Sequence, residues 1–354
     1  MTDASPAGTG AATPPALSVV PARPGLRARA GARVTDLGFA AGWGAVKLLP
    51  EPVARGAFDA AGRWAAGRQG RGVRQLRANL RVATDGRLTD AELDALTTRA
   101  VRSYARYWQE AFRLPRLSTE RVVARTEVIG REHLDRARSR GAGLVMVLPH
   151  SGNWDAAGVW FTDYLDGPFM TVAERLRPES LYRRFVDYRE SLGMRVVPLT
   201  GGPRPSTEVL REWLSDGGVT CLLVDRNLGA GGVPVSLFGR QATFPGGAAL
   251  LAERTGAPLV PTVCQFTPRG WRLVFSPEVP VAGPGRLRDR VAAAMQGVAD
   301  AFAEGIASQP EDWHVPGRIW PDVPPDGVPV PDGVPAGPDG APAGGPGGTG
   351  RELR

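Results

Sequence analysis

The sequence predicts an α/β protein with a mixed, largely parallel central sheet that is flanked by helices and preceded by a helical N-terminal part. After Glu127, short apolar runs alternate with amphipathic stretches, which is the pattern of strands and helices taken in turn. Strands that are joined through helices run parallel within one sheet. Before that point, over 32–117, the apolar residues recur at helical spacing instead.

Composition divides the chain into a folded domain and two low-complexity ends. Residues 1–31 are rich in Ala, Pro, Gly and Thr, and residues 323–354 are rich in Pro and Gly, with the motif DGVP at 326–329 and again at 332–335. Neither segment can bury enough apolar surface to offset its ordering entropy, so we expect a disordered leader and a disordered tail. The folded domain is expected over 32–322, with a helical part at 32–125 and an α/β core at 126–322.

The helical part combines amphipathic helices with arginine. Thr89 is followed three residues later by Glu92, which predicts a capping box at the start of a helix. Further upstream, six arginines and no acid lie between 63 and 81: Arg63, Arg68, Arg71, Arg74, Arg77 and Arg81. They are either a solvated helix face or a surface for anionic lipid headgroups, with Trp43 and Trp64 as interfacial partners. The sequence leaves both interpretations open.

The α/β core is expected to contain six strands and five helices. Apolar runs predict strands over 144–149, 169–172, 195–199, 219–224, 259–266 and 271–275. Amphipathic stretches predict helices over 154–162, 179–192, 206–215, 247–255 and 287–307. In such a sheet, binding and catalytic sites lie outside the carboxyl ends of the parallel strands.

Charge and composition exclude several classes of protein. The net charge is +7, from 43 Lys and Arg against 36 Asp and Glu, and Lys47 is the one lysine. Nucleic-acid binding is least favoured because the basic residues accompany tryptophans on helices and no recognised binding motif is present. The apolar run 37–46 is too short to span a bilayer, and no secretion signal is evident. Cys221 and Cys264 have neither disulfide nor metal-site spacing. We therefore expect a peripheral protein on the cytoplasmic face of the plasma membrane.

The sharpest chemical signal is the heptapeptide PHSGNWD at 149–155, directly after an apolar run. His150 would stand at the sheet edge, and Asp155 would enter the next helix and fold back toward the imidazole. Such a carboxylate orients a histidine and stabilises the imidazolium that forms during general-base catalysis. The bland alternative is a helix-capping loop with an incidental histidine. Asp225 ends the run 219–224 and so reaches the same edge, although an aspartate there is as often a turn former.

Other chemistries fit this segment less well. Ser151 lacks the Gly-x-Ser-x-Gly elbow of a hydrolase nucleophile. No second histidine or cysteine pair lies near His150 in the sequence to complete a zinc site. Direct transfer with histidine as the base, with no metal and no tightly bound cofactor, therefore remains.

The motif resembles the His-four-residues-Asp signature of the glycerolipid acyltransferase superfamily, in the branch of the lipid A late acyltransferases. The narrower resemblance, to the actinobacterial phosphatidylinositol mannoside acyltransferases, covers about residues 32–322. It rests on the segments DLGFAAGW at 36–43, AERL at 173–176, YRESLG at 188–193, VDRNL at 224–228 and EDWH at 311–314.

The resemblance implies transfer of a long acyl chain, usually palmitoyl, from acyl-CoA to a mannose hydroxyl of phosphatidylinositol mannoside. It implies that His150 is the base, Asp155 its motif partner and Asp225 a second acid near the histidine. Family members carry Glu where this chain has Asp225, so the same carboxylate stands on a shorter side chain. Glu174 and Arg189 match positions that hold the polar acceptor. Neighbouring residues of the same segments are further expected contacts of the substrate: Asn153, Arg175 and Arg226.

Backbone donors can be expected where glycines open a helix. Gly246 precedes and Gly247 begins the predicted helix 247–255, where free N–H groups could approach a phosphate of coenzyme A or the acyl oxyanion. This signal is weak, because glycine-rich turns are common. A lysophospholipid or other glycolipid acyltransferase, and a lipid-binding protein of the same fold without turnover, remain the alternatives.

Overall fold

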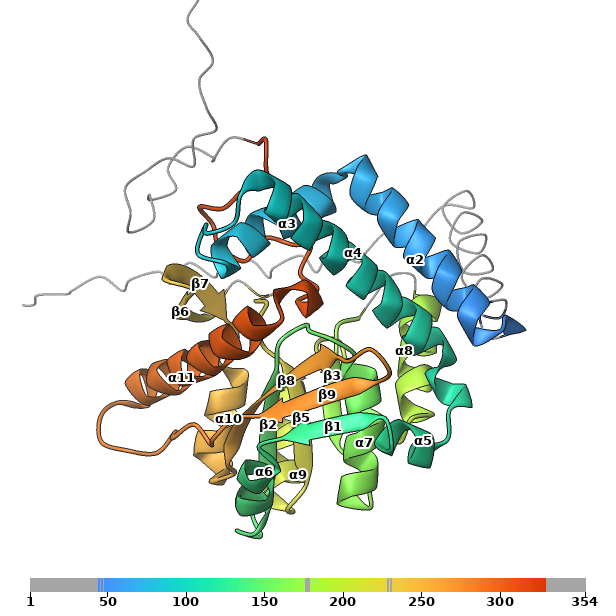
Figure 1. The fold of residues 1–354 in the computed structure, drawn as a ribbon. Coiled ribbons are helices and arrows are strands. Elements are labelled where there is room, and N and C mark those ends of the chain that lie inside the picture. Colours follow the sequence, from blue (N-terminus) through green and yellow to red (C-terminus); the bar gives the residue numbers. More distant parts are fainter. Residues whose placement is uncertain are drawn as a thin grey trace, which may run out of the picture.

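The computed structural model describes residues 48–175, 179–227 and 231–328, together with 44, 46 and 229. The leader predicted at 1–31, the apolar run to residue 43 and the tail beyond 328 lie outside the described residues. The described chain forms a layered α/β body with a group of helices along one end of it (Figure 1).

The centre of the fold is a seven-stranded sheet in the order β1-β9-β8-β2-β5-β3-β4. β2 pairs parallel with β5 and with β8, and β3 pairs parallel with β4 and β5. The exception is β8, which pairs antiparallel with β9. The prediction of a mixed, largely parallel sheet is confirmed. The strands are β1 (Thr126–Ile129), β2 (Leu144–Leu148), β3 (Met170–Ala173), β4 (Arg195–Pro198), β5 (Val219–Leu223), β8 (Leu259–Phe266) and β9 (Trp271–Phe275).

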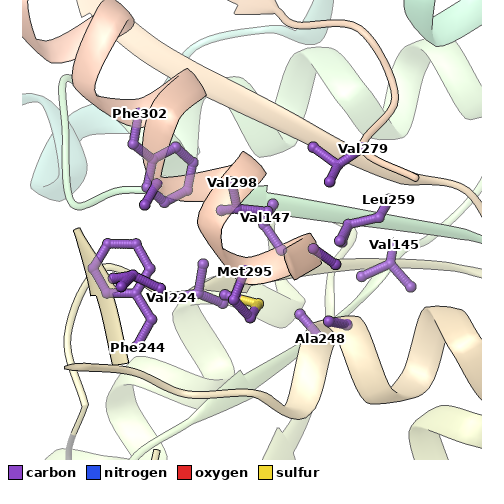
Figure 2. Packing of buried hydrophobic residues seen from close by; sticks show 14 of the residues in the cluster. Val145, Val147, Val224, Phe244, Ala248, Leu259, Val279, Met295, Val298 and Phe302 are labelled. Atoms are coloured by element: carbon purple, nitrogen blue, oxygen red, sulfur yellow. The ribbon is translucent and has the colours of Figure 1, made fainter. Parts of the chain in front are cut away.

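Helices cover both faces of the sheet. The central strand β2 is therefore buried on both faces, which is why every one of its residues is apolar. Val145 and Val147 point into one core cluster, whereas Leu144 and Met146 point into another. α9 (Ser206–Ser215), α10 (Gly247–Thr255) and α11 (Leu287–Ser308) contribute to the first cluster, which Figure 2 shows. α6 (Arg131–Arg138), α7 (Trp154–Leu165) and α8 (Glu179–Glu190) contribute to the second.

The described residues before the sheet are helical, as the spacing of apolar residues predicted, and the long helices are α2 (Glu51–Arg68), α3 (Arg71–Ala83) and α4 (Asp90–Arg113). The capping box at the start of α4 is confirmed, since the Thr89 side chain accepts from the backbone of Glu92 and the Glu92 carboxylate accepts from that of Thr89. α4 then runs along α2 and, through Tyr107 and Ala111, into the second core cluster. The short α5 (Thr119–Val123) leads from it into the sheet.

Part of the arginine-rich stretch serves intramolecular contacts. Arg77 and Arg81 bind Asp90 at the start of α4, and both also bind Asp326. Gln75 donates to the carbonyl of Val323 at 3.1 Å. The packed part of the chain therefore extends at least to Asp326, beyond the predicted boundary at 322.

Most element bounds agree with the prediction to within a few residues, but four strands and α-helices of the α/β core were missed. β1 has four residues and only one face half-buried, which leaves too short a pattern to read. α6 is so rich in charge that only Leu134 and Ala137 are buried. The hairpin of β6 (Val233–Leu237) and β7 (Arg240–Phe244) contains Pro234, which argues against a strand when read in isolation. Its two-residue turn has positive φ at both positions, as tight hairpins require.

Within the described ranges, no helix combines the length and the apolar character needed to cross a membrane.

Candidate active site

His150 and Asp225 lie side by side at the carboxyl edge of the sheet. Leu148 of β2 is paired with Leu223 of β5, and each strand is followed two residues later by one of these polar side chains. Because the two strands are adjacent and parallel, their ends deliver the imidazole and the carboxylate to the same point. The expectation that both reach one edge is confirmed.

The two side chains form a close hydrogen-bonded pair. Nδ1 of His150 lies 2.5 Å from Oδ1 of Asp225, and the backbone N–H of His150 donates to Oδ2 at 2.9 Å. A carboxylate can only accept, so Nδ1 carries the proton and the other ring nitrogen, Nε2, keeps its lone pair. The Asp225 side chain is fully buried, whereas that of His150 is 29% exposed. The imidazole is therefore fixed at Nδ1 by a buried carboxylate, while part of the ring remains accessible to solvent.

Burial by itself would raise the pKa of Asp225. The positive charge that His150 carries when protonated and the hydrogen bonds from His150 and Trp313 together outweigh that effect, so the pKa of Asp225 lies below its ordinary value. The indole Nε1–H of Trp313 donates to Oδ2 at 3.0 Å. Asp225 is therefore ionised at neutral pH and can stabilise a positive imidazolium.

The segment that follows α11 closes the back of this pair. Ser151 and Trp313 form an antiparallel bridge, and the backbone N–H of His314 donates to the carbonyl of His150 at 2.7 Å. The His314 ring is buried and its Nε2 lies 2.9 Å from the Ser103 hydroxyl, which also donates to Asp312 at 2.6 Å. Burial, followed by the charge of His150, lowers the pKa of His314 to about 3. His314 is therefore a neutral structural neighbour of His150.

Trp313 and His314 had no predicted role, although their segment, EDWH, was among those that carry the family resemblance. Nothing in the spacing along the chain links residue 313 to residue 150. Only the resemblance could have drawn attention to them.

The expectation that Asp155 folds back toward His150 is wrong. Asp155 lies in the first turn of α7 and is 1% exposed, and both of its oxygens are taken elsewhere. Oδ2 accepts from the Tyr107 hydroxyl at 2.9 Å, and Oδ1 lies 3.4 Å from Nε of Arg189. The helix carries the carboxylate away from the strand end, so the residue that orients His150 is Asp225.

Asp155 forms a buried ion pair with Arg189 and accepts a hydrogen bond from Tyr107. Burial raises the pKa of Asp155, against the opposing effects of Arg189 and Tyr107. Arg189 comes from α8, where its side chain is 15% exposed and its guanidinium lies 4.3 Å from the centre of the Trp154 ring. Arg189 therefore contacts the PHSGNWD motif itself, through Asp155 and Trp154.

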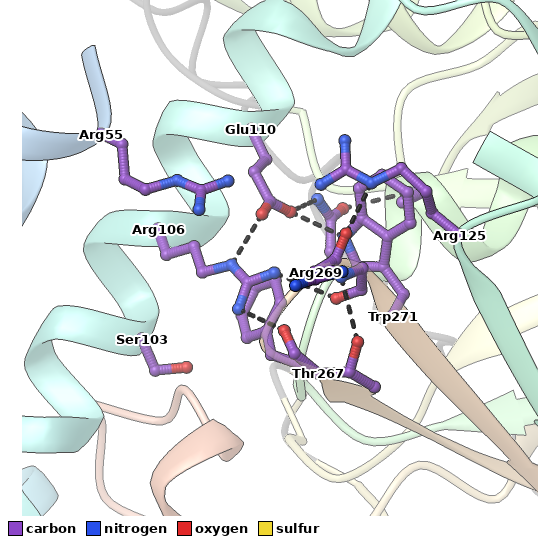
Figure 3. A network of polar contacts seen from close by, with 12 residues as sticks. Arg55, Ser103, Arg106, Glu110, Arg125, Thr267, Arg269 and Trp271 are labelled. Atoms are coloured by element: carbon purple, nitrogen blue, oxygen red, sulfur yellow. Dashed lines mark hydrogen bonds and ion pairs between the residues drawn. The ribbon is translucent and has the colours of Figure 1, made fainter. Parts of the chain in front are cut away.

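Asn153 was expected to contact substrate, and the structure gives it an internal role instead. It is 1% exposed and caps α7, accepting from the Ala156 backbone at 3.0 Å. Its amide donates to Oε2 of Glu110 at 2.9 Å. Glu110 also accepts from the Trp271 indole at 2.7 Å and from Arg106 at 2.7 Å (Figure 3). The start of α7 is therefore attached to α4 and β9.

The remaining predicted residues lie on the segments that follow β3 and β5 and at the start of α10. Glu174 and Arg175 follow β3, the neighbour of β5, and both are exposed; Arg175 binds Glu179 and the carbonyl of Gly201. Arg226 is half-buried, directly after Asp225. Gly246 and Gly247 open α10, as the sequence indicated. Their contact with a substrate stays a prediction.

The described residues contain no group of three or more His, Cys, Asp or Glu side chains arranged to hold a metal ion.

Comparison with known proteins places residues 29–320 in the family described as bacterial lipid A biosynthesis acyltransferase. The chain is 49% identical over 290 residues to the phosphatidylinositol mannoside acyltransferase of Mycolicibacterium smegmatis, and the aligned residues cover 82% of this chain and 92% of that protein. It is 46% identical over 288 residues to the protein of the same name from Mycobacterium tuberculosis, covering 81% and 88%.

Proposed function

Because the chain belongs to the bacterial lipid A biosynthesis acyltransferase family, we propose that it moves a long-chain acyl group, palmitoyl first among candidates, from acyl-CoA to a mannose hydroxyl of a phosphatidylinositol mannoside. The acceptor is taken from the names of its mycobacterial relatives. The acyl donor is taken from the family resemblance, and the mechanism is proposed from the chemistry of the site.

The observation that carries the mechanism is the pair of His150 and Asp225. A buried, ionised carboxylate on Nδ1 sets the tautomer that leaves Nε2 as a proton acceptor. The same carboxylate stabilises the imidazolium that forms when Nε2 takes a proton. The ring is partly exposed, so that a substrate hydroxyl can reach it.

The proposed reaction is a direct transfer. Nε2 of His150 removes the proton of a mannose hydroxyl while that oxygen attacks the thioester carbonyl carbon. The tetrahedral oxyanion then collapses, the carbon–sulfur bond breaks, and the departing thiolate takes the proton from the imidazolium. One ester bond forms and one thioester bond breaks, with no change of oxidation state and no acyl-enzyme.

Acceptor binding is proposed for charged residues around the pair. Glu174 and Arg175, exposed at the end of β3, could contact hydroxyl groups of the sugar, and Arg226 adjoins the carboxylate. Arg189 is anchored by Asp155 and Trp154, which would hold its guanidinium in one place while it contacts the acceptor.

Location at the cytoplasmic face of the plasma membrane is also proposed. α2 and the residues before it expose large apolar side chains. One of these is Trp64, and the Arg68 guanidinium packs on it at 4.7 Å from the ring centre. Such a combination suits the boundary between headgroups and acyl chains. The exposed apolar side chains are Leu48, Leu49, Val53 and Trp64.

The test of the mechanism is replacement of the base. His150→Ala should lower kcat by about 10²- to 10⁴-fold, since that is the usual contribution of a positioned general base. The assay follows labelled palmitoyl-CoA into phosphatidylinositol mannoside and also measures free coenzyme A. His133→Ala is the matched control, because His133 lies on α6 with a similarly exposed side chain of 25%. Near-normal product from folded His150→Ala would refute the proposal.

A further inference from the structure

A cavity of about 600 Å³ lies between α2 and α4, away from the pair of His150 and Asp225. Phe266, at the end of β8, and Asp312 also line it. This volume falls in the range of sites that hold small molecules. Four of the lining side chains are arginines: Arg55, Arg99, Arg102 and Arg106.

The lining has an excess of positive charge. Against the four arginines stand Asp59 and Asp312, and burial raises the pKa of Asp312 to about 6. Arg55 points from α2 toward Arg106 on α4 (Figure 3). The Arg55 side chain is 47% exposed, and among the described residues its one ion pair is with Glu51 on the same helix, so donors remain for another partner.

Gln109 is the second observation. It lines the same cavity and is only 3% exposed, yet its amide makes no hydrogen bond to any other part of the chain that the structure describes. An amide on the wall of an arginine-lined cavity can donate to a ligand oxygen.

We propose that this cavity binds a phosphate-bearing group, with Arg55 as its main cationic contact and the Gln109 amide as a further donor. Arg102 pairs with Asp59 through Nε, so only its terminal nitrogens are offered to the group. Planar guanidinium groups bind phosphate oxygens through paired, charge-assisted hydrogen bonds. Arg106 is already engaged by Glu110 and by the carbonyls of Thr267 and Gly270, and so shapes the wall.

The cavity is linked to the active site by a short chain of contacts. The Ser103 hydroxyl lines the cavity and also contacts His314, whose backbone holds the carbonyl of His150. If the proposed function holds, the phosphate group belongs to one of the two substrates. The 3′,5′-ADP end of acyl-CoA and the phosphoinositol of the acceptor lipid share this chemistry.

The experiment measures binding rather than turnover, so that it stands apart from the test of the mechanism. Pyrophosphate is titrated into the full chain by calorimetry, and 3′,5′-ADP and glycerophosphoinositol are titrated in parallel. We expect pyrophosphate to bind with a Kd of about 1 mM or tighter, as a few charge-assisted hydrogen bonds allow. Tighter binding of 3′,5′-ADP assigns the cavity to the donor, and tighter binding of glycerophosphoinositol assigns it to the acceptor.

Arg55→Gln should weaken pyrophosphate binding by about tenfold, and Gln109→Leu should weaken it by a smaller factor. Arg140→Gln is the matched control and should change it less than about twofold. Arg140 is 51% exposed and paired with Glu278, outside the cavity. Its replacement therefore removes the same charge from a side chain of similar exposure that does not line the cavity. His150→Ala should bind the probe normally. The proposal would be overturned if pyrophosphate showed no binding at about 10 mM, ten times the expected Kd. Equal weakening of pyrophosphate binding in Arg55→Gln and Arg140→Gln would overturn it as well.

Discussion

Asp225 and Asp155 are both buried, yet their surroundings shift their pKa values in opposite directions. Asp225 receives hydrogen bonds from His150 and Trp313, which favour its ionised form. Asp155 faces one arginine at 3.4 Å and one tyrosine, which offset its burial only in part. At the scale of single residues, these contacts assign the orienting role to one acid and a supporting role to the other.

Asp225→Asn should leave the fold intact and lower kcat by about 10²- to 10⁴-fold. The amide can no longer stabilise the imidazolium, and its N–H₂ group can hold the ring in the wrong tautomer. Steady-state kinetics with palmitoyl-CoA and circular dichroism measure both properties. An unchanged kcat would exclude Asp225 from the mechanism.

Asp155→Asn should act chiefly on stability. The change leaves the Arg189 guanidinium without its buried counter-charge, which costs about 3–5 kcal/mol in comparable sites. Urea unfolding measures the loss, and the activity of the remaining folded fraction should fall far less than in Asp225→Asn. A large loss of kcat at unchanged stability would restore the motif-partner role that the sequence suggested.

His314 makes the stability of the protein sensitive to acid. Its pKa is lowered from 6.5 to about 3 in the folded chain, so the unfolded chain binds a proton first as pH falls. The stability associated with neutral His314 is complete above pH 6.5 and is lost progressively as pH falls toward 3.

Between pH 7 and 5, the wild type should therefore lose about 2 kcal/mol more unfolding free energy than His314→Gln. The measurement is urea unfolding at intermediate pH values. Asp312, whose pKa is raised, is present in both proteins, so its opposing contribution cancels in the comparison. Parallel pH profiles for the two proteins would contradict the assignment.

At the scale of elements, α4 connects the N-terminal helices to the catalytic motif. Glu110 accepts from Arg106 on its own helix, from Asn153 at the start of α7 and from Trp271 on β9. Arg106 donates in turn to carbonyls of the turn that joins β8 and β9, and its guanidinium lies 4.1 Å from the Phe266 ring centre. The position of the motif loop thus depends on a helix that precedes the sheet.

Glu110→Gln should lower the unfolding free energy by about 1–3 kcal/mol. Glutamine has one acceptor oxygen for three donors, and its N–H₂ group would face the Arg106 guanidinium. Urea unfolding measures the change, with Glu132→Gln as the control, because Glu132 is 68% exposed on α6. Equal stability of both variants would mean that the network contributes little.

For the whole molecule, the apolar side chains exposed on and before α2 are expected to define which side approaches a membrane. Trp64→Ser should weaken binding to vesicles of anionic lipid by about tenfold, because the loss of one interfacial aromatic side chain costs about 1.5 kcal/mol or more. Ile129→Ser, on β1, is the control, since Ile129 is 51% and Trp64 64% exposed.

Flotation with vesicles of defined charge measures this binding, which should also weaken as salt rises. Equal loss in the two variants, or binding that is indifferent to salt and lipid charge, would remove the membrane-facing assignment. The arginines between 63 and 81 other than Arg77 and Arg81 would then be interpreted as part of a solvated helix face.

The sequence by itself determined the α/β class, the order of the main strands and helices, the capping box at Thr89 and the arrival of His150 and Asp225 at one edge of the sheet. These features depend on local periodicity, or on the rule that adjacent parallel strands end together. Strand ends are marked in the sequence itself, because the apolar run stops there.

Only the tertiary structure decided which acid orients the histidine. The four-residue spacing places Asp155 within a helix that turns it toward Tyr107 and Arg189, while the register of β2 and β5 brings Asp225 onto Nδ1. Trp313 and His314 were equally out of reach, because they contact the site from at least 88 residues away along the chain. Contacts of that kind follow from packing, which no spacing along the chain encodes.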